Sequence, residues 1–129
     1  TIKAMNNYLN NKNIKIASGD YKEILKKIKA NTKSFIYLDP PYFPISNSSS
    51  FTGYTDNAFG EREQKELKSE CDRLTNKGIR FLLSNSSCDF IHKLYSDYNI
   101  KIIKAKRTIN SDGNKRGEID EVLISNYEI

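Results

Sequence analysis

The consecutive residues Asp39, Pro40, Pro41 and Tyr42 carry the sharpest chemical signal in the chain. Each proline fixes its own φ angle and lacks an N–H donor. What remains to face a cleft is a surface of acceptors, made by the Asp39 carboxylate and the Pro40 carbonyl. Two fixed acceptors match a planar amino group with its two N–H donors, and the Tyr42 ring offers a flat face for stacking. The alternative is a rigid corner after a strand, in which Asp39 only caps a turn.

An amino group on an aromatic ring is a poor nucleophile, because its lone pair is delocalised into the ring. Acceptors fixed on both hydrogens favour a pyramidal nitrogen and stabilise the positive charge that develops as the nitrogen attacks a methyl group. The acceptors must be held in place beforehand. No strong general base is required, because the methylated nitrogen is itself acidic. If the ring is a nucleic-acid base, it must leave the duplex to reach such a site.

The elements that position these residues alternate between strand and helix patterns. Apolar–polar alternation predicts a short strand over 14–18, and continuous apolar residues predict strands buried on both faces over 34–38 and 79–84. Helices are expected at the chain start up to residue 12 and over 21–30, 61–76 and 89–95, and further strands over 100–106 and 120–126. Strands separated by helices indicate an α/β fold with a mainly parallel sheet. Only a loop joins the last two strands, which predicts an antiparallel hairpin at the end.

In a parallel sheet, ligands bind beyond the carboxyl ends of the strands. Asp20, Asp39 and Asn85 each follow or end a predicted strand, so we expect them to lie at that edge. Asp20 could instead serve only to cap the helix that follows it. We interpret Asn85 as a structural residue that holds the turn at the end of its strand.

Composition narrows the function classes. The 129 residues suit one domain, and 21 basic against 16 acidic residues give a net charge of +5. This charge weakly favours a polyanionic partner, but on charge alone an ordinary lysine-rich chain is the stronger interpretation. No apolar run approaches the length of a membrane helix, so we expect no membrane association. Cys71 and Cys88 have no C-x-x-C spacing, and His92 is the single histidine. We therefore expect free thiols, no bound metal and a reducing compartment, the cytoplasm.

Several motifs together resemble the Dam-type (D12 class) DNA adenine-N6 methyltransferases. The likeness rests on the Asp39–Tyr42 motif, Phe51–Tyr54, Leu83–Asn85 and the stretch from Arg107 to Asn126, and it runs from about residue 14 to 127. The resemblance implies a Rossmann-like fold dependent on S-adenosylmethionine and methyl transfer to a flipped adenine of double-stranded DNA. It leaves open whether the parent enzyme regulates its host or belongs to a restriction–modification system.

The resemblance also implies roles for individual residues. Asp39, Pro40, Pro41 and Tyr42 form the catalytic motif, in which Asp39, Pro40 and Tyr42 hold the target adenine. Asp39 also lies close to the amino-acid part of the cofactor. Asp20 and Tyr21 belong to a turn that contacts the cofactor's adenine.

Two further groups are assigned to the DNA substrate by the same resemblance. Phe51, Thr52 and Tyr54 sit in a loop that closes over the flipped base, although an aromatic loop can equally be packing. The basic residues Lys106, Arg107 and Arg116 lie in the closing hairpin, where they can contact phosphates. Alternatively, these basic residues only prevent an edge strand from pairing with another chain.

One part of the family pattern is missing. The family's cofactor loop is rich in closely spaced glycines, but no two of the six glycines here are separated by fewer than four positions. The family's DNA-recognition domain is also absent. We therefore expect residues 1–129 to be the C-terminal portion of a catalytic domain, with an incomplete cofactor site and little activity alone.

The expected partners are double-stranded DNA and a missing N-terminal half or complementary chain, with self-association through exposed sheet edges. Two other functions stay open. The parent could methylate an amino group of RNA or a protein amide, or the chain could be a non-enzymatic module for DNA binding or assembly.

Overall fold

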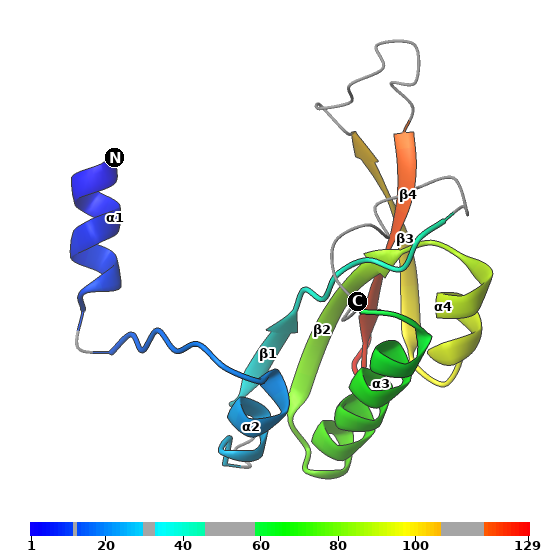
Figure 1. Ribbon diagram of the computed structural model, residues 1–129, viewed down its shortest axis with the longest axis horizontal. Helices are drawn as coiled ribbons and strands as arrows, with labels where there is room; N and C mark the ends of the chain where they lie inside the picture. The colour runs from blue at the N-terminus through cyan, green and yellow to red at the C-terminus, as the bar shows by residue number, and fades with distance from the viewer. Residues whose placement is uncertain (12, 30–32, 46–58, 107–117) are drawn as a thin grey trace.

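The computed structural model of the protein describes residues 1–11, 13–29, 33–45, 59–106 and 118–129 (Figure 1). Its elements in chain order are α1 (Ile2–Leu9), α2 (Tyr21–Lys26), β1 (Phe35–Leu38), α3 (Glu61–Asn76), β2 (Arg80–Ser86), α4 (Asp89–Leu94), β3 (Asn99–Lys106) and β4 (Glu118–Ser125). The predicted mixed α/β class is confirmed. The predicted helix over 21–30 is too long, because α2 ends at Lys26. No described helix is both long and apolar enough to cross a lipid bilayer.

The four strands form one sheet in the order β1-β2-β4-β3. β1 pairs with β2 in parallel, whereas β4 pairs antiparallel with both β2 and β3. The predicted closing hairpin is therefore confirmed, but the prediction of a mainly parallel sheet is wrong for the described residues. The reason is that β4 inserts between β2 and β3, so the hairpin adds two antiparallel pairings to the single parallel one.

The predicted strand over 14–18 is also wrong. These residues have no regular secondary structure and form an extended segment between α1 and α2 (Figure 1). A strand needs a neighbour with which to exchange backbone hydrogen bonds, and no described strand pairs with this segment. Its apolar–polar alternation is therefore not matched by burial, and the side chain of Ile16 is 75% exposed.

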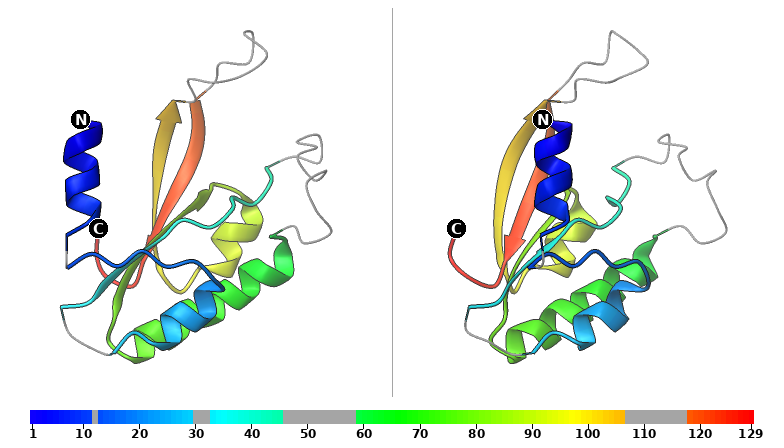
Figure 2. Two further views of the ribbon diagram at one scale, coloured as in Figure 1. Left: turned by 60° about the vertical axis from the view of Figure 1, so that its left-hand side comes forward. Right: turned by 90° about the vertical axis from the view of Figure 1, so that its left-hand side faces the viewer.

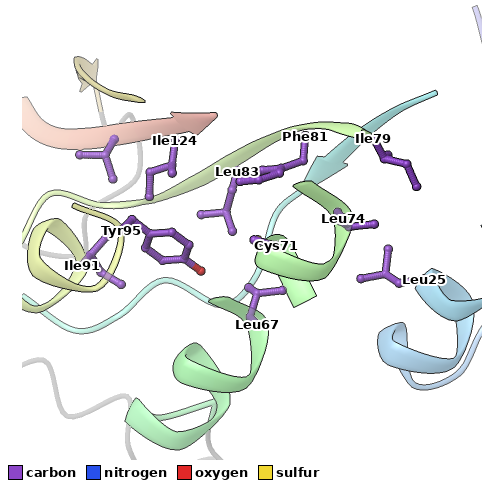
Figure 3. Packing of buried hydrophobic residues seen from close by; sticks show 11 residues of the cluster. Leu25, Leu67, Cys71, Leu74, Ile79, Phe81, Leu83, Ile91, Tyr95 and Ile124 are labelled. Carbon is purple, nitrogen blue, oxygen red and sulfur yellow. The ribbon is translucent and has the colours of Figure 1, made fainter. Parts of the chain in front are cut away.

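Helices α2, α3 and α4 pack on one face of the sheet (Figure 2). Between these helices and the sheet lies the core, which is made of side chains from all of these elements except β1 and β3 (Figure 3). Its buried members are Leu25, Leu67, Cys71, Leu74, Ile79, Phe81, Leu83, Ile91, Tyr95, Val122 and Ile124. α1 has no buried residue and stands apart from this core (Figures 1 and 2).

The strand predicted over 34–38 forms as β1, but it is not buried on both faces. Ile36 and Leu38 pack against the core, while Phe35 and Tyr37 on the other face are each 55% exposed. β1 is an edge strand, and the described helices cover only one face of the sheet. The continuous apolar run therefore predicted the strand correctly, but it did not predict that one face of the strand is exposed.

The two thiols are expected to differ sharply in reactivity. Burial raises the pKa of the Cys71 thiol to about 12, whereas Cys88 is only partly buried. Thiolate is the reactive form, and roughly one in 10⁴ thiols of such a pKa is ionised at pH 8. We expect iodoacetamide at pH 8 to label Cys88 in the folded protein and Cys71 only after unfolding, as measured by peptide mass spectrometry. The folded Cys88→Ala control should take up no label, because its remaining thiol, Cys71, is buried. Rapid labelling of Cys71 in the folded protein would contradict that buried position.

Candidate active site

The Asp39–Tyr42 turn begins where β1 leaves the sheet. β1 ends at Leu38, which is in register with Leu83 of the parallel strand β2. Pro40 and Pro41 cannot donate to a strand ladder, so the chain turns away from the sheet here. Asp39 consequently lies beside Ser84, the residue that follows Leu83. This confirms the expectation that Asp39 lies at the carboxyl end of its strand.

A short chain of hydroxyl groups orients the Asp39 carboxylate. The Tyr37 hydroxyl donates to Ser84 Oγ at 3.1 Å, and Ser84 Oγ donates to Asp39 Oδ1 at 2.8 Å. Ser84 is buried, whereas Asp39 is exposed. Among the described residues, no group donates to Asp39 Oδ2 or to the Pro40 carbonyl oxygen. Ser84 thus holds one carboxylate oxygen of Asp39, and within the described part of the chain the other oxygen and the Pro40 carbonyl have no donor.

Tyr42 is held over the same part of the sheet. Its hydroxyl donates to Glu121 Oε2 of β4 at 3.3 Å. Burial is the main cause that raises the pKa of this hydroxyl. The carboxylates of Glu121 and Asp39 raise the pKa further, whereas a hydrogen bond with Ser84 lowers it. The hydroxyl is therefore protonated at neutral pH and can act as a donor. Asp39 and Tyr42, predicted to act together, both lie around Ser84.

Two buried amide side chains, those of Asn85 and Gln64, hold the backbone of the turn by hydrogen bonds. Asn85 Oδ1 accepts hydrogen bonds from the backbone N–H of Phe43 at 3.0 Å and of Ser86 at 2.9 Å. Gln64 Nε2 donates to the Pro41 carbonyl at 3.0 Å. The Ser86 hydroxyl also donates to the Phe43 carbonyl. Asn85 is thus structural as predicted, but the turn that it holds follows β1 and not the end of its own strand, β2.

Asp20 and Tyr21 lie at a different place, an open hollow of about 420 Å³. The hollow is lined by Gly19, Asp20, Tyr21, Lys22, Phe59, Arg62, Glu63 and Glu66. Asp20 caps α2, because its Oδ1 accepts from the backbone N–H of Lys22 at 2.8 Å. The Tyr21 and Phe59 rings are tilted against each other with centroids 6.5 Å apart. The capping role considered for Asp20 is therefore present.

One residue that lines the hollow, Tyr21, carries a buried polar atom. The Tyr21 hydroxyl oxygen is buried and has no hydrogen-bond partner among the described residues. Burial raises the pKa of this hydroxyl, so it stays protonated at neutral pH. Lys22 Nζ bonds Glu66 Oε2 at 2.8 Å and ties α2 to α3 along the rim. The aromatic rings of Tyr21 and Phe59 in the lining suit contact with a flat ring system.

The remaining predicted site residues are not placed. Phe51, Thr52, Tyr54, Arg107 and Arg116 lie outside the described residues, as does the side chain of Lys106 at the end of β3. Among the described side chains, no three His, Cys, Asp or Glu residues are grouped so that they could hold a metal ion.

Sequence reasoning missed Gln64, Tyr37 and Glu121, and it gave Ser84 no role. Of these, only Gln64 had a usable signal. It shares the buried face of α3 with Leu67, Cys71 and Leu74, so it is a polar residue on an apolar stripe. The contacts of Tyr37, Ser84 and Glu121 depend on which strands are neighbours, and the sequence pattern did not determine the strand order.

Comparisons with known proteins agree with the motif pattern. Residues 1–109 match the family model of the D12 class N6 adenine-specific DNA methyltransferase. The Type II methyltransferase M1.LlaDCHI of Lactococcus lactis subsp. cremoris is 41% identical over 126 residues, or 98% of this chain and 44% of the relative. The Type II methyltransferase M.MjaIII of Methanocaldococcus jannaschii is 44% identical over 118 residues, or 90% of this chain and 40% of the relative.

A DNA adenine methylase of Escherichia coli (strain K12) is 33% identical over 95 residues, which cover 74% of this chain and 34% of the relative. The chain thus spans less than half the length of these curated relatives. The matched region of the family model contains the Asp39–Tyr42 turn and the side chains that anchor it. The chain therefore belongs to the family of D12 class N6 adenine-specific DNA methyltransferases.

Proposed function

We propose that the Asp39–Tyr42 turn holds the exocyclic amino group of an adenine flipped out of DNA, so that its nitrogen accepts a methyl group from S-adenosylmethionine. The observation that carries this proposal is the fixed acceptor pair at the turn. Ser84 fixes Asp39 Oδ1 at 2.8 Å, and among the described residues no donor occupies Asp39 Oδ2 or the Pro40 carbonyl. Membership of an adenine-specific methyltransferase family supports the choice of adenine and of DNA.

Asp39 and Pro40 act by accepting the two amino hydrogens. The Asp39 carboxylate and the Pro40 carbonyl draw these hydrogens out of the plane of the base, which directs the nitrogen lone pair toward the methyl group. Both acceptors then stabilise the positive charge that grows on nitrogen as the new C–N bond forms. The bound cofactor supplies a methyl group on a positively charged sulfur. Tyr42 stacks on the base and holds it in plane, while Glu121 fixes the Tyr42 hydroxyl.

The hollow at Asp20 and Tyr21 fits the adenine end of the cofactor. Tyr21 and Phe59 line it with aromatic rings. At the methionine end the family resemblance assigns only Asp39, because the sequence lacks the closely spaced glycines of the family pattern. Asp20 contributes the turn itself, since its carboxylate caps α2.

We propose that residues 1–129 form the C-terminal portion of a Rossmann-like catalytic domain and are completed by further polypeptide. The curated relatives are more than twice as long as the region matched. β1 is an edge strand with exposed Phe35 and Tyr37, and α1 exposes Ile2 and Met5. These surfaces are suited to burial by another part of the protein or, in its absence, to self-association. Alone, the chain should transfer little or no methyl.

A methyl-transfer assay of the intact protein tests the proposed function. Radiolabelled S-adenosylmethionine is offered with double-stranded DNA, with RNA and with protein as separate acceptors, and nucleoside mass spectrometry identifies the product. We expect N6-methyladenine in DNA only. Label in RNA or protein alone would assign another amine substrate. DNA binding without transfer by a protein that binds the cofactor would point to a non-enzymatic module.

A further inference from the structure

We propose that Gln64 of α3 is a positioning residue that sets the geometry of the Asp39–Tyr42 turn for methyl transfer. This inference rests on the proposed function of that turn. Gln64 is fully buried, with 0% of its surface exposed, and it is a polar residue on the otherwise apolar inner face of α3.

The contacts of Gln64 close a ring around Tyr42. Gln64 Nε2 donates to the Pro41 carbonyl at 3.0 Å, and Gln64 Oε1 accepts from Asn85 Nδ2 at 3.1 Å. Asn85 Oδ1 in turn accepts from the backbone N–H of Phe43 at 3.0 Å. The two amides therefore grip the backbone on both sides of Tyr42. We call Gln64 and Asn85 the amide clamp.

The orientation of the amide clamp is fixed by its ends. The Pro41 carbonyl can only accept and the Phe43 N–H can only donate, so each amide must present one specific end to the backbone. Asn85 Oδ1 also accepts from the backbone N–H of Ser86 at 2.9 Å, which fixes its orientation a second time. Reversing either amide would place like groups against each other. The clamp thus specifies one backbone position for the turn.

An apolar side chain at position 64 would leave the Pro41 carbonyl and the Asn85 amide N–H without their hydrogen-bond partner. What the amide at position 64 achieves is contact with a backbone carbonyl that no helix or strand satisfies. Proline residues at 40 and 41 make the turn stiff, so a small displacement at Pro41 moves the Pro40 carbonyl and the Asp39 carboxylate together. Gln64 therefore acts on both acceptors without touching the substrate.

Contacts of neighbouring residues hold the part of α3 that carries Gln64. Glu63 Oε2 accepts from the backbone N–H of Gly60 at 3.0 Å, which caps the helix. Glu66 binds Lys22 of α2 at 2.8 Å. These neighbours of Gln64 line the hollow, and neither depends on the Gln64 side chain. Loss of the Gln64 amide should consequently disturb the turn and leave the hollow in place.

The test uses the intact protein with Gln64→Met, which keeps the length of the side chain and removes both polar ends. Gln64→Glu is the second variant, since it keeps an acceptor for Asn85 but turns a carboxylate oxygen toward the Pro41 carbonyl. Cys71→Ala is the matched control, because Cys71 lies on the same buried face of α3 and outside the clamp. For each protein, kcat, the KM for S-adenosylmethionine and the exchange rate of the Phe43 amide hydrogen are measured.

We expect both Gln64 variants to lower kcat by about 10- to 100-fold, the loss that a misplaced reacting group can cause. The KM for S-adenosylmethionine should change by less than about twofold, and the Phe43 amide should exchange about tenfold faster or more. Cys71→Ala should lower thermal stability while leaving kcat and Phe43 exchange near those of the unmodified protein.

A kcat loss no larger than that of Cys71→Ala, or unchanged exchange at Phe43, would overturn the positioning role. Equal losses in kcat and in cofactor affinity would also overturn it, since they would indicate general disruption of α3. If the unmodified protein transfers no methyl to DNA, the proposed function fails instead, and the Phe43 exchange measurement still decides whether Gln64 holds the turn.

Discussion

Replacing Asp39 by asparagine in the intact protein is expected to reduce methyl transfer to adenine by at least about 10²- to 10³-fold. Asparagine has nearly the same shape and can still accept from Ser84, as Asp39 Oδ1 does at 2.8 Å. It would then present an NH₂ group in place of the carboxylate oxygen Oδ2. The substrate N–H that Asp39 accepts would meet another donor, and the carboxylate's stabilisation of positive charge on nitrogen would be lost. Asp39→Ala should cause at least as large a loss.

For each variant, kcat is measured together with substrate binding and the thermal unfolding midpoint. Because Asp39 is exposed and lies outside the hydrophobic core, we expect the thermal unfolding midpoint of Asp39→Asn to change by only a few degrees. Asp97→Asn is the matched control, since Asp97 is an exposed carboxylate that pairs only with Lys68 among the described residues. It should retain near-normal transfer. Full activity of Asp39→Asn or Asp39→Ala would remove Asp39 from the mechanism, and an equally inactive Asp97→Asn would show that the assay reports stability.

The site couples rigidity to chemistry through three kinds of support. Prolines restrict the backbone of the turn, hydroxyl groups orient the Asp39 carboxylate from the sheet, and the amide clamp holds the backbone around Tyr42. Catalysis by fixed acceptors gains only from interactions that are in place before the nitrogen becomes charged. Ser84 and Asn85 lie in β2 and Gln64 lies in α3, two elements whose apolar side chains form much of the core. The core therefore contributes to function by fixing these two elements.

The sequence was sufficient to predict the elements that position the turn. Helical periodicity predicted α3 over Glu61–Asn76 with the bounds that the structure shows, and Gly78, with a φ of 70°, lies just beyond the end of that helix. The paired prolines predicted the end of β1. These features are local, because each depends on residues within a few positions of one another.

What could not be predicted depends on neighbours distant in sequence. The segment over 14–18 alternates like a strand but has no described partner, and β4 lies between β2 and β3 although spacing alone gives no strand order. The support of Asp39 by Ser84 follows from the register of β1 with β2, in which Leu38 lies opposite Leu83. Gln64 was visible as a polar residue on an apolar stripe, yet its partner, the Pro41 carbonyl, was not.

Titration of the isolated 129-residue chain with S-adenosylmethionine is expected to show binding at least about 100-fold weaker than that of the intact protein, a difference of about 2.7 kcal/mol. The hollow at Tyr21 offers a site for the adenine end, but the sequence contains no pair of closely spaced glycines to hold the methionine end. Circular dichroism would first establish that the chain is folded, and calorimetry would then measure binding.

Adenosine is the comparison ligand, because it contains the adenine end of the cofactor and lacks the methionine end. If the hollow supplies the only contacts, the chain should bind adenosine and S-adenosylmethionine with affinities within about threefold of each other, which is under 1 kcal/mol. The intact protein should instead prefer the full cofactor strongly. Tight one-to-one binding of S-adenosylmethionine by the chain would mean that other residues hold the methionine end or that a dimer rebuilds the site. Analytical ultracentrifugation of the complex separates these two cases, and a monomeric complex would refute the proposal that this chain carries only part of the cofactor site.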